Sequence, residues 1–165
     1  LAITAINQLN KNYNINISLQ NIKNGLEKTK WPGRLEIISK KPLIILDGAH
    51  NKSAALILKK ALLSYFKEYK IIFILGILKD KDISSIIKIL SPIAKIIITS
   101  QANSERSQDA FKLSEKVKKY FNGEIIPIPQ IEKAIKLAKI KAKNEKTLIC
   151  ITGSIYLIGE VKNKI

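Results

Sequence analysis

Five polar side chains at the ends of apolar runs could build a binding or catalytic site. They are Arg34, Asp47, His50, Asn51 and Ser154. Four of the five fall within one segment, 31–51, which reads WPGRLEIISKKPLIILDGAHN. A guanidinium, a carboxylate, an imidazole, an amide and a hydroxyl can together hold an anion, accept hydroxyl groups and move a proton. The elements around them must bring these groups to one place.

Asp47 ends the apolar run 43–46. A carboxylate at the end of a buried strand needs hydrogen-bond donors, because burying it without them is costly. It could cap the helix expected from residue 51 or hold a turn. It could equally accept the hydroxyls of a ribose, as the acidic residue of dinucleotide-binding folds does.

His50 and Ser154 each have a functional and a structural interpretation. His50 is the one histidine of the chain and lies beside a carboxylate at the start of an expected helix, although single histidines are often structural. Ser154 follows Gly153 and opens another helix, whose backbone N–H groups could hold an anion. The same pattern also suits a tight turn with an N-cap serine.

The charge of the chain has two explanations. Lysine and arginine number 29 against 13 acidic residues, a net charge of +16. So large a positive charge could serve a surface that binds nucleic acid or a membrane. It could also result from an AT-rich genome, which raises the content of Ile, Lys and Asn together. We favour composition, because the lysines are scattered and only Arg34 and Arg106 are arginine. We therefore expect no nucleic-acid or membrane partner. We expect a functional role for each arginine, because the ammonium group of lysine cannot make the paired hydrogen bonds of a guanidinium.

Several classes lack support in the sequence. No apolar run reaches the roughly 18 residues of a membrane span, and no signal peptide or methionine is present. We expect a piece of a longer, cytoplasmic protein. Cys150 is expected in the core. No metal-ligand spacing, no Ser-His-Asp or Cys-His nucleophile and no GxxxxGK[ST] phosphate loop occurs.

From residue 34 onward, strand and helix patterns alternate. Strands are expected at 35–38, 43–46, 70–75, 95–99, 124–128 and 147–152. Helices are expected at 51–66, 83–90, 109–121, 131–143 and 154–162. The order predicts an α/β fold with a mostly parallel six-stranded sheet, helices on both faces, and a first strand paired antiparallel in a hairpin. Sites in such folds lie at the carboxyl ends of the strands.

The first thirty residues have a different pattern. Helices are expected at 1–13 and 18–28, with Ser18 as the cap of the second. Two helices cannot form a core of their own. We therefore expect 1–30 to end a preceding domain, 31–33 to be a hinge and 34–165 to be the second domain.

Four motifs in this order resemble one family. WPGRLEII, LIILDGAHN, LGILKDKDI and ITGSIYLIGE are similar to the folylpolyglutamate synthase/dihydrofolate synthase family of the Mur ligase superfamily. The resemblance implies a Rossmann-like Mur ligase C-terminal domain at 34–165, preceded by the end of the central ATPase domain. It implies an ATP-dependent, ADP-forming ligase of folate biosynthesis that adds L-glutamate to dihydropteroate, folate or both through an acyl phosphate. Without the phosphate loop, the fragment is expected to be inactive alone.

The resemblance also assigns roles. Arg34 would be catalytic, reaching the phosphates of ATP, with Asp47 and Asn51 holding the nucleotide. His50 and Ser154 would face the incoming glutamate, and His50 would be catalytic. Magnesium ligands are expected in the central domain, and the ligase is expected to be a monomer. One departure is Lys52, where the family commonly has proline.

Two alternatives remain open at this point. One is a basic nucleic-acid-binding module of the same fold. The other is a Mur-type ligase for a different amino acid.

Overall fold

The computed structural model describes residues 1–143 and 146–164. The chain divides into two compact units, Leu1–Pro32 and Gly33–Ile165. The first holds helices α1 (Ala2–Tyr13) and α2 (Leu19–Lys28). Ser18 caps α2 as predicted, since its Oγ accepts the Asn21 N–H at 3.1 Å. Residues 144, 145 and 165 of the expected second domain lie outside the described residues.

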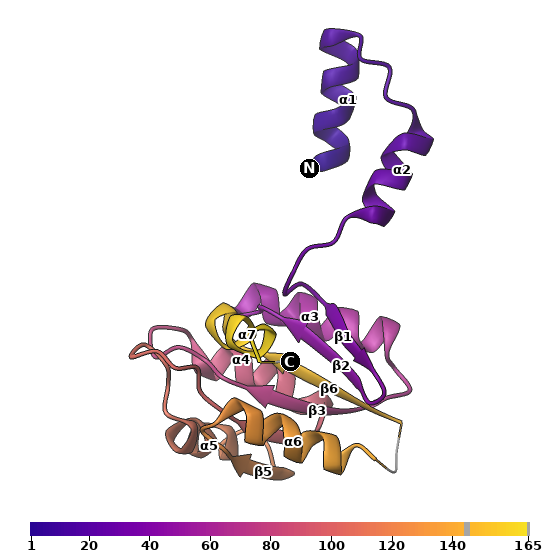
Figure 1. Ribbon diagram of the computed structural model, residues 1–165. Helices are drawn as coiled ribbons and strands as arrows, with labels where there is room; N and C mark the ends of the chain where they lie inside the picture. Colours follow the sequence, from indigo (N-terminus) through magenta and orange to yellow (C-terminus); the bar gives the residue numbers. More distant parts are fainter. Residues whose placement is uncertain (144–145, 165) are drawn as a thin grey trace. The chain divides into compact units, whose positions relative to one another are not determined.

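The second unit is built on a six-stranded sheet in the order β1-β2-β6-β3-β4-β5 (Figure 1). The strands are β1 (Glu36–Lys40), β2 (Leu43–Asp47), β3 (Lys70–Leu75), β4 (Ala94–Thr99), β5 (Glu124–Pro127) and β6 (Thr147–Thr152). β1 pairs antiparallel with β2, and all other pairs are parallel. This confirms the predicted fold class.

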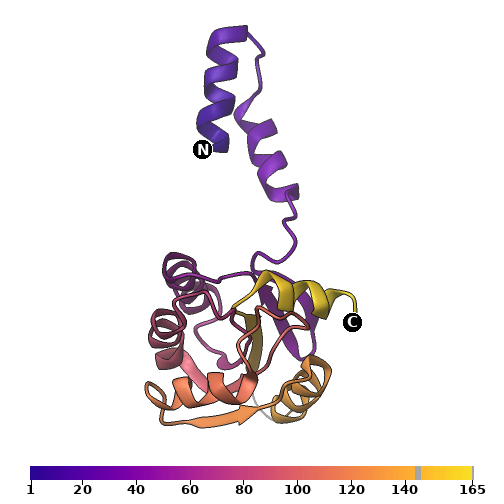
Figure 2. The same ribbon diagram turned by 90° about the vertical axis from the view of Figure 1, so that its left-hand side faces the viewer.

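Helices cover both faces of the sheet (Figure 2). They are α3 (Lys52–Tyr65), α4 (Ile83–Leu90) with the short 3-10 turn η1 (Ser91–Ile93), α5 (Ala110–Lys118), α6 (Ile131–Lys141) and α7 (Ile155–Lys162). Successive strand residues point to opposite faces. Phe73 and Cys150 therefore pack under α3, α4 and α5, while Ile74 and Ile151 pack under α6 and α7.

Several element ends differ from the predictions. β1 begins one residue late, because Leu35 has a left-handed φ of 44° that no strand accepts. α5 ends at Lys118 instead of reaching Phe121. The N–H groups of Lys119 and Tyr120 bond to carbonyls three residues back, which tightens and ends the helix. α6 likewise ends at Lys141 and not at residue 143.

The carboxyl ends of β2, β6, β3 and β4 form one edge. Gly76 N–H donates to the Thr152 carbonyl at 3.1 Å, and Ser100 N–H donates to the Leu75 carbonyl at 2.8 Å. The loops after neighbouring strands are thereby tied together. Across residues 1–143 and 146–164, we find neither a helix suited to crossing a membrane nor a cluster of three or more side chains able to share a metal ion.

Candidate functional site

Arg34 lies in a fixed backbone setting at the entry to the sheet. Gly33 has a φ of 69°, and its carbonyl accepts the Gly48 N–H at 2.8 Å. The Arg34 guanidinium covers Gly48, where a Cβ would lie 2.5 Å from Nη1. Arg34 is exposed, and within the described part of the chain its guanidinium has no hydrogen-bond or ion-pair partner. A cation is thus held at the strand edge without an anion.

Asp47 fixes the backbone on both sides of this site. Its Oδ2 accepts the Leu35 N–H and its Oδ1 accepts the Ala49 N–H, each at 2.9 Å. The carboxylate therefore joins the residue after Arg34 to the loop after β2. The predicted turn role is confirmed. The alternative of a helix cap is wrong, because Asn51 caps α3 through Oδ1, which accepts the Ala54 N–H at 2.8 Å.

Glu36 is a positioning residue that the sequence did not single out. Its Oε2 accepts the Gly33 N–H at 2.6 Å, and its Oε1 accepts the Lys162 ammonium at 2.8 Å. Both bonds lower the pKa of the Glu36 carboxyl from its ordinary value of 4.5, and the bond from Lys162 has the larger effect. The glutamate of the motif WPGRLE thus ties the turn before Arg34 to α7.

The pH dependence of folding should report this contact. A lowered pKa means that the folded state binds fewer protons than the unfolded state, so the stabilisation is present above about pH 4.5 and lost as pH falls through the folded pKa. Glu36→Gln should remove this acid dependence while keeping an acceptor for Gly33. Urea unfolding of both proteins between about pH 3 and 7 should show their stabilities converging at low pH. A constant difference in stability between the two proteins across this pH range would contradict the role of Glu36.

His50 and Ser154 meet at one small cavity of about 170 Å³. The Nδ1 of His50 lies 2.8 Å from the Gly48 carbonyl. A carbonyl only accepts, so this contact places a proton on Nδ1 and leaves Nε2 for a ligand. Ser154 is 1% exposed, and its Oγ accepts the Tyr156 N–H at 3.1 Å. The predicted N-cap role of Ser154 is confirmed, and its hydroxyl proton is still available for donation.

Two cationic side chains also line this cavity, and the sequence interpretation missed Lys81. Lys81, Arg106 and Tyr156 join His50 and Ser154 there. Arg106 Nη2 lies 3.1 and 3.0 Å from the two carboxylate oxygens of Asp80, and Lys81 Nζ lies 2.9 Å from the same group. Hydrogen bonds from Lys81 and then Arg106 lower the pKa of Asp80. The rarity of arginine pointed to Arg106, whereas no argument from the sequence assigned a role to Lys81 or Asp80.

Gly48 connects the two halves of the site. A Cβ on Gly48 would lie 2.5 Å from Arg34 Nη1 and 3.0 Å from the Cγ2 of Ile155, which lines the cavity. Arg34, Asp47 and His50 thus contact the loop after β2, and Ser154 shares a cavity with His50. Asn51 follows directly in sequence, but its side-chain oxygen is used at the start of α3.

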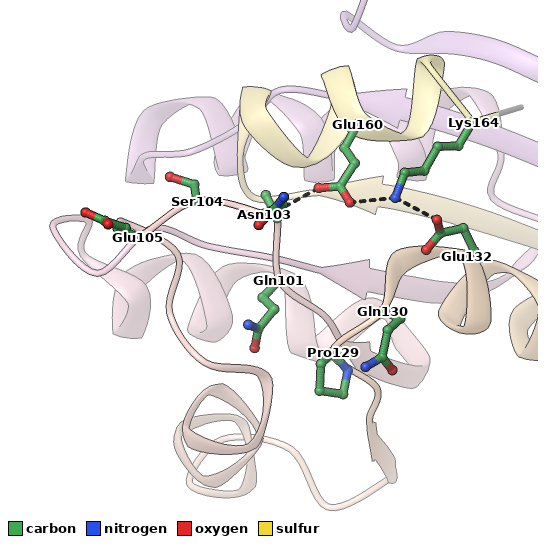
Figure 3. Close-up of a pocket in the computed structure, with 10 residues that line it drawn as sticks. Gln101, Asn103, Ser104, Glu105, Pro129, Gln130, Glu132, Glu160 and Lys164 are labelled. Atoms are coloured by element: carbon green, nitrogen blue, oxygen red, sulfur yellow. Dashed lines mark hydrogen bonds and ion pairs between the residues drawn. The ribbon is translucent and has the colours of Figure 1, made fainter.

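A larger cavity, of about 610 Å³, lies beside the loops after β4 and β5 (Figure 3). Lys164 bridges Glu132 at 2.6 Å and Glu160 at 3.0 Å, and Glu160 also accepts the Asn103 N–H at 2.9 Å. Its charged groups largely satisfy one another, and none of the five predicted residues lines it. The smaller cavity is therefore the better candidate despite its size.

Known proteins are similar to this chain in sequence and in fold. The family model described as Mur ligase, glutamate ligase domain matches residues 33–155. A dihydrofolate synthase/folylpolyglutamate synthase of Bacillus subtilis is 31% identical over 168 residues, which cover 100% of this chain and 37% of that protein. This chain therefore spans well under half the length of that relative.

Solved structures extend the comparison. A folylpolyglutamate synthase of Mycobacterium tuberculosis, complexed with ADP and AMPPCP, has a TM-score of 0.88 at 24% identity, covering 98% of this chain and 38% of its own. That similarity shows the fold. E. coli FolC in complex with DHPP and ADP has a TM-score of 0.79 at 26% identity, covering 90% of this chain and 34% of its own. The chain belongs to the Mur ligase, glutamate ligase domain family, and its relatives are folylpolyglutamate and dihydrofolate synthases, as its motifs predicted.

Proposed function

We propose that this chain is the C-terminal part of an ATP-dependent, ADP-forming ligase that adds L-glutamate to dihydropteroate or folate. The observation that carries the proposal is the exposed guanidinium of Arg34, which lies against Gly48 and has no partner among residues 1–143 and 146–164. Asp47 accepts the N–H of the next residue, Leu35, and so fixes the backbone beside it. A fixed cation of this kind suits a phosphate-bearing substrate. The name of the Bacillus relative and the ADP bound in E. coli FolC support the same activity.

The division of labour within the ligase is part of the proposal. Residues 1–30 would end the central ATPase domain, 31–33 would be the hinge, and 34–165 would be the domain that presents Arg34. The described residues contain no cluster of three or more His, Cys, Asp or Glu side chains that could hold a metal ion. We place the Mg²⁺ ligands in the rest of the ligase chain and expect residues 1–165 to be inactive alone. A Yersinia pestis relative was solved with AMPPNP and Mn ion, which supports a divalent metal.

The nucleotide side of the site would use three residues. ATP supplies the phosphoryl group that activates the carboxylate of the pterin substrate. Arg34 would neutralise charge on the phosphates, which is the main contribution a protein makes to phosphoryl transfer. Asp47 has oxygen lone pairs beyond its two backbone bonds and fits a ribose hydroxyl. The Asn51 oxygen caps α3, and its amide nitrogen can donate to the nucleotide.

The cavity at His50 would hold the glutamate. Its two carboxylates suit the ammonium of Lys81 and the guanidinium of Arg106, while the Ser154 hydroxyl can donate to either. The Nε2 of His50 would accept a proton from the amino group as that group attacks. Asp80 would be a positioning residue, because it bonds to both cations.

The amino-acid dependence of ADP formation tests the proposal. In the complete ligase, L-glutamate should stimulate ADP release with dihydropteroate or folate, and aspartate or alanine should not. If another amino acid stimulated ADP release instead, the result would favour the alternative of a Mur-type ligase for a different amino acid. Salt-dependent DNA binding by the 165-residue chain, without any ligase activity of the complete protein, would favour the nucleic-acid module.

A further inference from the structure

A second, strongly basic cavity lies at the opposite edge of the sheet, where the parallel strands begin. Its volume is about 360 Å³, within the range typical of small-ligand pockets. The lining combines the turn between β1 and β2, the entry to β3, the end of α6 and the entry to β6 (Figure 1). Six-residue strands separate this edge from the Arg34 edge by roughly 20 Å.

Five lysines surround this cavity, which we call the lysine cavity. They are Lys40, Lys41, Lys139, Lys143 and Lys146. Half of the lining residues are thus lysine, although lysine and arginine together make up 29 of the 165 residues of the chain. Among residues 1–143 and 146–164, Glu68 is the one carboxylate paired with them, through Lys146.

Ordinary causes explain part of this cluster. Lysines near the end of α6 complement the negative end of the helix, which accounts for Lys139 and Lys143. The lysines of the β1–β2 turn and of the β6 entry have no such explanation. A lysine-rich composition scatters charge over a surface and does not by itself bring two segments that are far apart in the sequence, the β1–β2 turn and the stretch from α6 to β6, around one cavity.

Between the ammonium groups the lining is largely apolar. Pro42, Leu43 and Ala142 form part of it, and the Nζ of Lys146 lies 5.2 Å from the centroid of the Tyr69 ring. A cleft with charge of one sign and low-dielectric walls concentrates the field and attracts counter-ions. The geometry points to a ligand with several closely spaced negative charges.

We propose that the lysine cavity binds a small polyphosphate anion, at a site separate from the one that contains Arg34. Lysine binds phosphate as a flexible point charge, so several lysines can adapt to the oxygens of a chain of phosphates. Inorganic polyphosphate and the triphosphate of a nucleotide share this chemistry. The proposal does not depend on the ligase activity.

Calorimetric titration of the 165-residue chain with inorganic tripolyphosphate at low salt tests the proposal. The paired variant Lys41→Gln/Lys143→Gln should bind roughly tenfold more weakly than the unmodified chain. The matched variant Lys112→Gln/Lys119→Gln removes the same charge from α5 and the residue after it, and should bind within about twofold of the unmodified chain.

Two results would overturn the proposal. They are no binding at low salt and equal weakening by both lysine pairs. Thermal unfolding of each variant checks that the fold is kept. Competition by ATP against tripolyphosphate would identify nucleotides as ligands of the lysine cavity, and absence of competition would assign it to inorganic polyphosphate.

Discussion

Replacement of Arg34 by alanine is expected to lower ADP formation by the complete ligase by about 10³-fold, because a positioned arginine contributes at least that much in phosphoryl transfer. Arg34 is exposed and has no partner within the described residues, so stability should change by less than about 0.5 kcal/mol. Arg34→Lys should recover only part of the rate, since an ammonium lacks the fork. Steady-state kinetics together with thermal unfolding separates the two effects.

Gly48→Ala tests whether the position of the Arg34 guanidinium matters as well as its charge. The added Cβ would lie 2.5 Å from Arg34 Nη1, so the guanidinium must move while its charge remains. We expect a drop in kcat smaller than that of Arg34→Ala. Full activity of both variants would remove Arg34 from the proposed mechanism, whereas an effect of Gly48→Ala alone would point to Ile155 and the cavity.

Gly153→Ala is expected to cost the largest amount of folding stability. Gly153 has a φ of 107°, which side chains rarely adopt, and its Cβ would lie 2.8 Å from the Gly76 carbonyl oxygen. Backbone strain and the clash together should destabilise the fold by about 3 kcal/mol. Thermal unfolding should show a decrease in Tm of roughly 10 °C.

Gly159→Ala is the matched control. Gly159 lies in α7, six residues further on, and a Cβ there meets no atom within 4 Å. Alanine in a helix interior should raise stability by roughly 0.5–1 kcal/mol. Equal destabilisation by the two substitutions would show that the loop after β6 has no special constraint.

The chain order alone determined the fold class. Buried strands read as short apolar runs, and amphipathic helices alternate with them, so a parallel sheet covered on both faces was the one arrangement that buried every apolar face. The cap at Ser18 and the core position of Cys150 also followed from local rules. Such features depend on neighbours within a few residues.

The site was only partly determined by sequence. The types and spacing of Arg34, Asp47, His50 and Ser154 identified the strand edge, but their roles depend on contacts between distant residues. β6, the last strand in the chain, inserts between β2 and β3, and this brings Ser154 beside His50. No local pattern specifies that insertion, because strand order is set by packing of the whole sheet.

Backbone geometry and side-chain pairing were decided by the tertiary structure as well. The left-handed φ of Leu35 turns its N–H to Asp47, a conformation that leucine seldom adopts and that propensity does not predict. The bond from Glu36 to Lys162 and the bond from Arg106 to Asp80 join residues 126 and 26 positions apart. The sequence by itself supplied the chemical groups and the order of the elements. Only the folded chain decided which backbone N–H groups hold Asp47 and which carboxylate holds Arg106 and Lys81. It also decided that Arg34 is left without a partner in the described residues. Contacts of this kind join residues that only the complete sheet brings together.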